Sequence, residues 1–190
     1  MKTFISLLRG INVSGQNKIR MPELKRLSES LNLGNVVTYI QSGNVIFDCA
    51  EQDPAYLASS IEAEITRSFG TSVRVFLRDK NRFQQIIDSN PFSNQRNEDS
   101  EKLHVTFLSD SPSESALSNL PVPADPKGSG AGNADEFLVY NKEIYLFCPN
   151  GYGRTKLSNN FFERKLSVSA TTRNWKTVNA LYEIANQRRP

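Results

Sequence analysis

The order of strand-like and helix-like segments over the first 80 residues restricts the fold of this chain more than any other feature of its sequence. Four strands are predicted from short runs of apolar and β-branched residues, at residues 3–8, 36–40, 45–47 and 73–77. Two helices are predicted from apolar residues at helical spacing. One begins near Pro22 and the other after Asp53 and Pro54, because proline suits the first helical turn and aspartate can cap it. The resulting order, β-α-β-β-α-β, is that of a ferredoxin-like domain.

The second half of the chain is less regular, and its predicted order is α-β-α-β-β-α-α. Strands are expected at residues 103–108, 137–140 and 144–147, and helices after Asp79, after the capping box at 111–114, at 157–166 and at 174–186. A proline- and glycine-rich loop at residues 121–132 is expected to be mobile. We therefore expect an α+β protein of two ferredoxin-like halves, residues 1–80 and 81–190, with antiparallel sheets and helices packed on one face. The halves share an order of elements but no recognisable repeat of residues.

The composition argues against several classes of protein. With 38% hydrophobic and 23% charged residues among 190, a core can form and disorder is not expected. No apolar run reaches the ~20 residues that a membrane helix needs, and Arg9 ends an N-terminal apolar run that is too short for a signal peptide. Two cysteines and a single histidine cannot supply a disulfide framework or a closed zinc site. We expect a cytoplasmic protein with no metal, no cofactor and no membrane partner.

Charge is distributed unevenly along the chain. Residues 1–30 hold six basic and two acidic side chains, and residues 151–190 hold eight and two, whereas residues 81–136 hold four basic and nine acidic ones. If the two chain ends meet, they form a positive surface that attracts phosphate or carboxylate groups. The sequence therefore favours an anionic ligand.

Three stretches of the chain resemble the signature of the DUF1697 family, whose members have no assigned function. They are LLRGINV at residues 7–13, followed by Lys18 and Met21, then TYIQSGNV at residues 38–45, and GYGRTKL at residues 151–157, which continues to ATTRNW at residues 170–175. The sequence NPF at residues 90–92 and the pair His104-Val105 also fit, so the resemblance spans nearly the entire chain. It implies a bacterial protein with a two-part, ferredoxin-like fold, and it implies no activity, cofactor or catalytic residue.

Two loops of the first half hold candidate ligand-binding residues. These are Arg9, Asn12 and Lys18 in the loop after the first strand, and Gln41, Ser42 and Asn44 in the predicted hairpin turn. A glycine-rich loop that leads to a helix N-terminus can cradle an anion, although this one lacks the spacing of a nucleotide P-loop and a purely structural loop is the alternative. Glycine and asparagine are what a tight hairpin requires, so turn geometry alone is also an alternative for the second set.

A third group of candidates surrounds two predicted helix starts near the C-terminus. Arg154, Lys156 and Asn160 stand at the first start and Arg173 at the second, where free backbone N–H groups and the helix dipole favour an anion. The arginines suit a forked contact to phosphate or carboxylate. The alternative is that residues such as Asn174 only cap the last helix.

The sequence leaves three functions open. The favoured hypothesis is a binding module for a phosphate- or carboxylate-bearing ligand in a basic cleft formed by both chain ends, with a nucleotide or, less well supported, nucleic acid as partner. The second is an enzyme that acts on a phosphorylated small molecule, although the lone His104 has no nearby acid to orient it as a base. The third is a protein-interaction module in which these motifs only maintain the fold.

Overall fold

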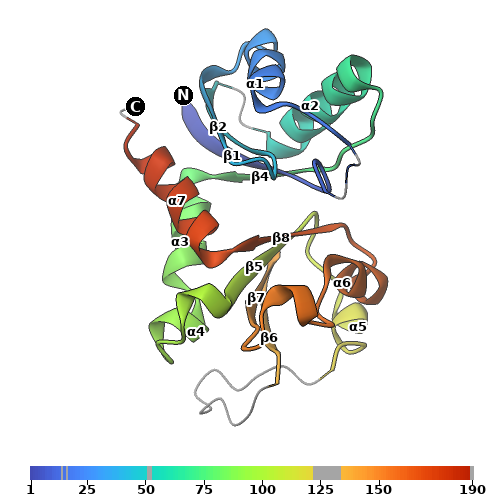
Figure 1. The fold of residues 1–190 in the computed structure, drawn as a ribbon, viewed down its shortest axis with the longest axis vertical. Coiled ribbons are helices and arrows are strands. Elements are labelled where there is room, and N and C mark those ends of the chain that lie inside the picture. The colour runs from blue at the N-terminus through green and yellow to red at the C-terminus, as the bar shows by residue number, and fades with distance from the viewer. Residues whose placement is uncertain (14, 16, 51–52, 122–133, 189–190) are drawn as a thin grey trace. The chain divides into compact units, whose positions relative to one another are not determined.

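The structure is a computed structural model that describes residues 1–13, 15, 17–50, 53–121 and 134–188 (Figure 1). It divides into two compact units. The first unit is Met1–Gln84 together with the C-terminal segment from Ala180, and the second unit is Gln85–Asn179. The C-terminal segment, which the sequence placed in the second half, thus groups with the first. The predicted mobile loop at 121–132 lies outside the described residues from position 122 onward.

The first unit has the predicted ferredoxin-like order. Its elements are β1 (Lys2–Leu8), α1 (Met21–Ser30), β2 (Gly34–Tyr39), β3 (Asn44–Cys49), α2 (Pro54–Phe69) and β4 (Val75–Asp79). The strands form one antiparallel sheet in the order β2-β3-β1-β4. Figure 1 shows α1 and α2 side by side on one face of this sheet. The α+β prediction with helices on one face is confirmed.

Local sequence explains where the helices of the first unit begin and which residues form its core. The Asp53 carboxylate accepts a hydrogen bond from the backbone N–H of Ala55 at 2.9 Å and so caps α2. Alternate residues of the strands, such as Phe4 and Phe47, point toward the helices and stack with ring centroids 6.0 Å apart. The hydrophobic stripe of α2 closes the same core with Ile61.

The second unit repeats this architecture. Its elements are the end of α3 (Lys80–Asp88), α4 (Pro91–Asn94), β5 (Leu103–Leu108), α5 (Glu114–Leu117), β6 (Glu136–Tyr140), β7 (Glu143–Phe147), α6 (Asn159–Leu166), β8 (Ala170–Asn174) and the start of α7 (Trp175–Asn186). Short 3-10 helices lie at Ser100–Lys102 and Tyr152–Arg154. The sheet order is β6-β7-β5-β8. The predicted element order omitted β8, because this polar strand shows no apolar alternation.

Three strands of each sheet match residue by residue. Leu8 of β1 pairs with Val75 of β4, and Leu108 of β5 pairs with Ala170 of β8. The backbone N–H of each leucine also donates at 2.8 Å to a carbonyl in the adjacent hairpin. Leu8 and Leu108 therefore occupy equivalent positions. The strand registers carry this equivalence along β1, β3 and β4 and their counterparts β5, β7 and β8, whereas a shift between Gly34 and Val37 interrupts it in β2. The chain contains a structural repeat that its sequence does not reveal.

The repeat continues into the helix that follows each sheet. At equivalent positions, Asp79 ends β4 and Asn174 ends β8. Asp79 accepts a hydrogen bond from the N–H of Arg82, and Asn174 accepts one from the N–H of Thr177, both at 2.7 Å. Each side chain thus stabilises the first turn of the next helix, α3 or α7. For Asn174, the capping alternative is confirmed.

Candidate functional site

The first two groups of sequence-predicted residues meet in the first unit. The side-chain amide of Asn12 donates to the backbone carbonyls of Ile19 at 2.9 Å and Gln41 at 2.8 Å, and its oxygen accepts from the N–H of Ile19. Asn12 therefore joins the loop after β1 to the hairpin turn between β2 and β3. The structure brings these two segments together.

Within this junction the asparagines hold the backbone, and the other candidate side chains differ in exposure. Asn44 is fully buried, and its amide donates to the carbonyl of Tyr39 and the hydroxyl of Ser42, both at 3.0 Å. Arg9 is half-buried, while Lys18 and Gln41 are exposed. These contacts fit the alternative in which Asn12 and Asn44 maintain the loop and the hairpin turn.

Three of the four C-terminal candidates surround the start of α6 in the second unit. The Ser158 hydroxyl caps α6 by accepting from the N–H of Phe161 at 3.3 Å. Arg154, Lys156 and Asn160 are all exposed and lie close in sequence to this helix start. A contact between these side chains and a ligand stays a prediction.

Arg173 lies apart from those three residues. The Thr172 hydroxyl donates to Asn159 of α6 at 2.6 Å, which shows that Thr172 faces this helix. Successive residues of a strand point to opposite faces, so Arg173 projects from the other face of the sheet. It is buried, it donates to the Thr171 hydroxyl at 3.0 Å, and burial lowers its pKa to about 10. Arg173 thus lies in β8, directly before Asn174, which caps α7.

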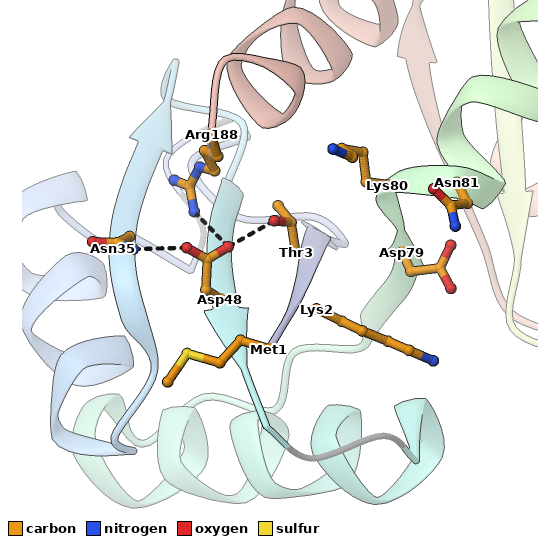
Figure 2. A pocket seen from close by; sticks show the side chains of 9 residues that line it. All are labelled: Met1, Lys2, Thr3, Asn35, Asp48, Asp79, Lys80, Asn81 and Arg188. Carbon is orange, nitrogen blue, oxygen red and sulfur yellow. Dashed lines mark hydrogen bonds and ion pairs between the residues drawn. The ribbon is translucent and has the colours of Figure 1, made fainter. Parts of the chain in front are cut away.

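The sequence did not predict the pocket of the first unit. It has a volume of about 470 Å³ and lies where β1 begins and where β3 and β4 end (Figure 2). The lining residues are Met1, Lys2, Thr3, Asn35, Asp48, Asp79, Lys80, Asn81 and Arg188. They come from separate parts of the sequence, and all belong to the first unit.

Asp48 is the most constrained group of this pocket. Its carboxylate accepts hydrogen bonds from the hydroxyl of Thr3 at 2.7 Å, the amide of Asn35 at 2.8 Å and the guanidinium of Arg188 at 3.4 Å. Figure 2 shows the three donors around it. Burial opposes ionisation, but these hydrogen bonds and the Arg188 charge together lower the pKa of Asp48. Asp48 is therefore ionised at neutral pH, and Arg188 compensates its charge.

Two lysines add positive charge to the pocket. Lys2 is exposed and Lys80 is half-buried, and neither forms an ion pair within the described residues. The remaining acid, Asp79, is engaged as the cap of α3. With Asp48 neutralised by Arg188, the two ammonium groups outnumber the one remaining carboxylate. The pocket thus has an excess of positive charge.

The second unit shows that the fold does not require such a pocket. By strand register, Phe147 is the counterpart of Asp48. The guanidinium of Arg96 lies 5.4 Å from the centre of the Phe147 ring and contacts Glu98 at 2.6 Å and Glu136 at 2.8 Å. The Arg96 side chain is only 6% exposed. In the second unit, then, the corresponding position is filled and neutralised by the protein itself.

His104 and Cys148 supply little catalytic chemistry. His104 is buried and stacks on Tyr152 with ring centroids 4.8 Å apart, and its Nδ1 has no hydrogen-bond partner among the residues described. Burial raises the pKa of Cys148 to about 11, so this cysteine is a thiol at neutral pH. In the described ranges, no three His, Cys, Asp or Glu side chains gather where they could hold a metal ion.

Phe4 occupies the position in the first unit that is equivalent to His104. Replacing His104 with phenylalanine should therefore reduce the loss of unfolding free energy that occurs as the pH falls from 7 to 5. Burial lowers the pKa of His104 below its ordinary 6.5, so the unfolded chain binds a proton first as pH falls. The stability contributed by neutral His104 is complete above pH 6.5 and decreases below it. Urea unfolding between pH 7 and pH 5 should show a smaller loss for His104→Phe than for wild type. Equal losses of stability in the two proteins would contradict the assignment of this pH dependence to His104.

Comparison with known proteins supports the fold. Residues 1–145 match the family described as a protein of unknown function (DUF1697). The conserved bacterial protein SP0830 from Streptococcus pneumoniae has a similar structure, with a TM-score of 0.70, 20% sequence identity and coverage of 97% of this chain and 98% of that chain. A comparison with curated proteins gives no match. None of the described helices combines the length and the apolar character needed to span a membrane.

Proposed function

The chain belongs to the DUF1697 family, and we propose that it binds a small phosphate- or carboxylate-bearing anion in the pocket of its first unit. The observation that carries this proposal is the pair of ammonium groups of Lys2 and Lys80, which line the pocket without an acidic partner among the described residues. An anion would supply the missing counter-charge and accept charge-assisted hydrogen bonds from both.

The pocket retains one part of the sequence-based hypothesis and changes another. A ligand held by both chain ends was expected, and this pocket is lined by Lys2 near one end and Arg188 near the other. The candidate residues of the loops do not line it. That the loop holding Arg9 and the loop holding Arg154, which belong to different units, form one cleft stays a prediction.

The dimensions and lining of the pocket favour a small molecule over nucleic acid. A volume of about 470 Å³ lies within the range of small-molecule sites, roughly 300–1,000 Å³. The lining residues include no aromatic side chain on which a base could stack. We therefore propose a compact ligand such as a phosphomonoester or a di- or tricarboxylate, acting through its charge.

Replacing both lysines with glutamine should abolish the response of the protein to anions. Inorganic phosphate, succinate and citrate, compared with chloride at equal ionic strength, should raise the melting temperature of the wild-type chain. Each charge-assisted hydrogen bond contributes roughly 1.5–3 kcal/mol, so the loss of Lys2 and Lys80 should weaken binding at least about a hundredfold. Thermal shift identifies the anion, and calorimetry measures its Kd.

A matched control removes two lysines elsewhere. Lys25 and Lys165 lie on α1 and α6, and their replacement with glutamine changes the net charge by the same amount. This double variant should bind the anion like wild type. If it loses binding equally, the effect is one of net charge. If binding instead depends on Arg154 and Lys156, the site lies at α6. Absence of any anion response in wild type would favour the protein-interaction alternative.

A further inference from the structure

We infer that residues 183–188, the last turn of α7 and the two residues after it, are a ligand-stabilised clamp: an anion in the pocket bridges Arg188 to the lysines and holds this segment on β3. This inference rests on the proposed function, and it adds a structural response to binding. It follows from how Arg188 is held, from the contrast with Arg96 and from the position of Arg188 beyond the last helix.

Arg188 is attached to the first unit by two contacts of ordinary or weak geometry. Its guanidinium donates to the Asp48 carboxylate at 3.4 Å and to the backbone carbonyl of Ile46 at 3.1 Å. A guanidinium has five N–H donors, and the described residues accept from two of those groups. Since its side chain is only 11% exposed, few of the other donors can be satisfied by bulk water. An anion in the pocket could accept from them in a forked, bidentate contact.

Arg96 shows what the same kind of attachment looks like when it is complete. Its guanidinium makes four hydrogen bonds to Glu98 and Glu136, at 2.6 to 3.0 Å, and lies over the rings of Phe92 and Phe147. The protein alone satisfies Arg96, so this arginine is fixed without a ligand. Arg188, at the equivalent place in the first unit, has one carboxylate at a longer distance and no aromatic ring in contact among the described residues. An anionic ligand could supply the additional acceptors that Arg188 lacks among the described residues.

Arg188 lies just beyond the last helix, so its contacts act on the end of that helix. Helix α7 ends at Asn186, and the N–H of Gln187 donates back to the carbonyl of Glu183 at 3.1 Å. Leu181 and Ala185 of α7 are fully buried, so most of the helix is held by its own packing. Arg188 follows the last helical contacts, and its side chain bonds the end of this segment to β3. Binding and docking are then linked reciprocally: the anion favours the docked segment, and the docked segment favours the anion.

Amide hydrogen exchange of the full chain, with and without inorganic phosphate, tests the clamp. At a phosphate concentration of ten times Kd, exchange at residues 183–188 should slow about tenfold if these amides exchange from the undocked, ligand-free state. Replacing Arg188 with glutamine should remove this slowing and weaken phosphate binding, while Arg188→Lys, which keeps the charge but not the fork, should retain part of both effects. If Arg188→Gln does not fold, Arg188→Lys alone decides, because the clamp requires it to show reduced slowing.

The outcomes separate the clamp from the proposed function. Phosphate binding that depends on Lys2 and Lys80 but leaves exchange at residues 183–188 unchanged would overturn the clamp and leave the anion site intact. Full slowing in Arg188→Lys would also overturn it, since the forked contact would not be needed. No phosphate binding by wild type, combined with no binding of succinate or citrate, would overturn both.

Discussion

Replacement of Arg96 with methionine should lower the free energy of unfolding by about 3–5 kcal/mol. Methionine resembles the stem of arginine in length, so the packing against Phe92 and Phe147 should largely survive. What is lost is the charge that two partly buried carboxylates, Glu98 and Glu136, share. The two acids lie against the same guanidinium, and without it they repel one another and lack their hydrogen-bond donors. Urea unfolding followed by far-UV circular dichroism measures the change.

Two further variants show whether the carboxylates cause the loss. Replacing Glu98 and Glu136 with glutamine in the Arg96→Met background should recover much of the stability, because no unpaired charge is left behind. The exposed ion pair between Arg67 and Glu64, 2.6 Å apart, serves as a control. Removing Arg67 should change stability little because solvent already screens that pair. If the triple variant is no more stable than Arg96→Met, packing and not charge explains the effect.

Replacement of Gly43 with alanine should destabilise the first unit by about 2–4 kcal/mol. Gly43 has a φ of +75°, a region that costs side-chain-bearing residues energy. A Cβ atom at this position would also lie 2.5 Å from Cδ1 of Ile11 and 2.9 Å from Cβ of Leu8. Those atoms belong to β1 and to the loop that follows it, so the junction of that loop with the hairpin turn must open to make room. Urea unfolding again measures the loss.

Two other glycines separate the two causes. Gly10 has a φ of +66°, but no atom lies within 4 Å of the place that an alanine methyl group would occupy, so Gly10→Ala should show only the backbone cost, about 1–2 kcal/mol. Gly153 has neither a positive φ nor a close neighbour, and Gly153→Ala should be nearly neutral. If Gly43→Ala costs no more than Gly10→Ala, steric closeness at Gly43 contributes nothing.

Local sequence signals predicted the elements of the first unit because each signal acts within a few residues. Asp53 and Pro54 begin α2, and the apolar run that ends at Phe47 identifies β3, whatever the rest of the chain does. The order of six elements then left few ways to pair the strands. The same reasoning failed for β8, whose threonines are β-branched but lack the apolar alternation that marks a half-buried strand. Their β-branching was the signal that could have identified it.

The candidate site was only partly predictable. The positions of Asn12 and Gln41 in loops indicated contact residues, and the structure places their segments together. One signal for the pocket was present in the sequence: Asp48 interrupts an otherwise apolar strand, and a carboxylate in such a strand requires donors to balance its burial. The identity of those donors could not be read, because Thr3 and Arg188 are remote from Asp48 along the chain.

The sequence by itself determined the architecture and the positive charge of both chain ends, since apolar strand runs, helix caps and charge are properties of neighbouring residues. The tertiary structure decided which cations face a pocket and which are neutralised. Lys80 and Arg96 are both basic residues of the same region, yet Lys80 lines an open pocket and Arg96 lies between two glutamates, of which Glu136 is placed by the register of β6. Register depends on pairing between distant strands, and a one-residue shift would reverse every side chain.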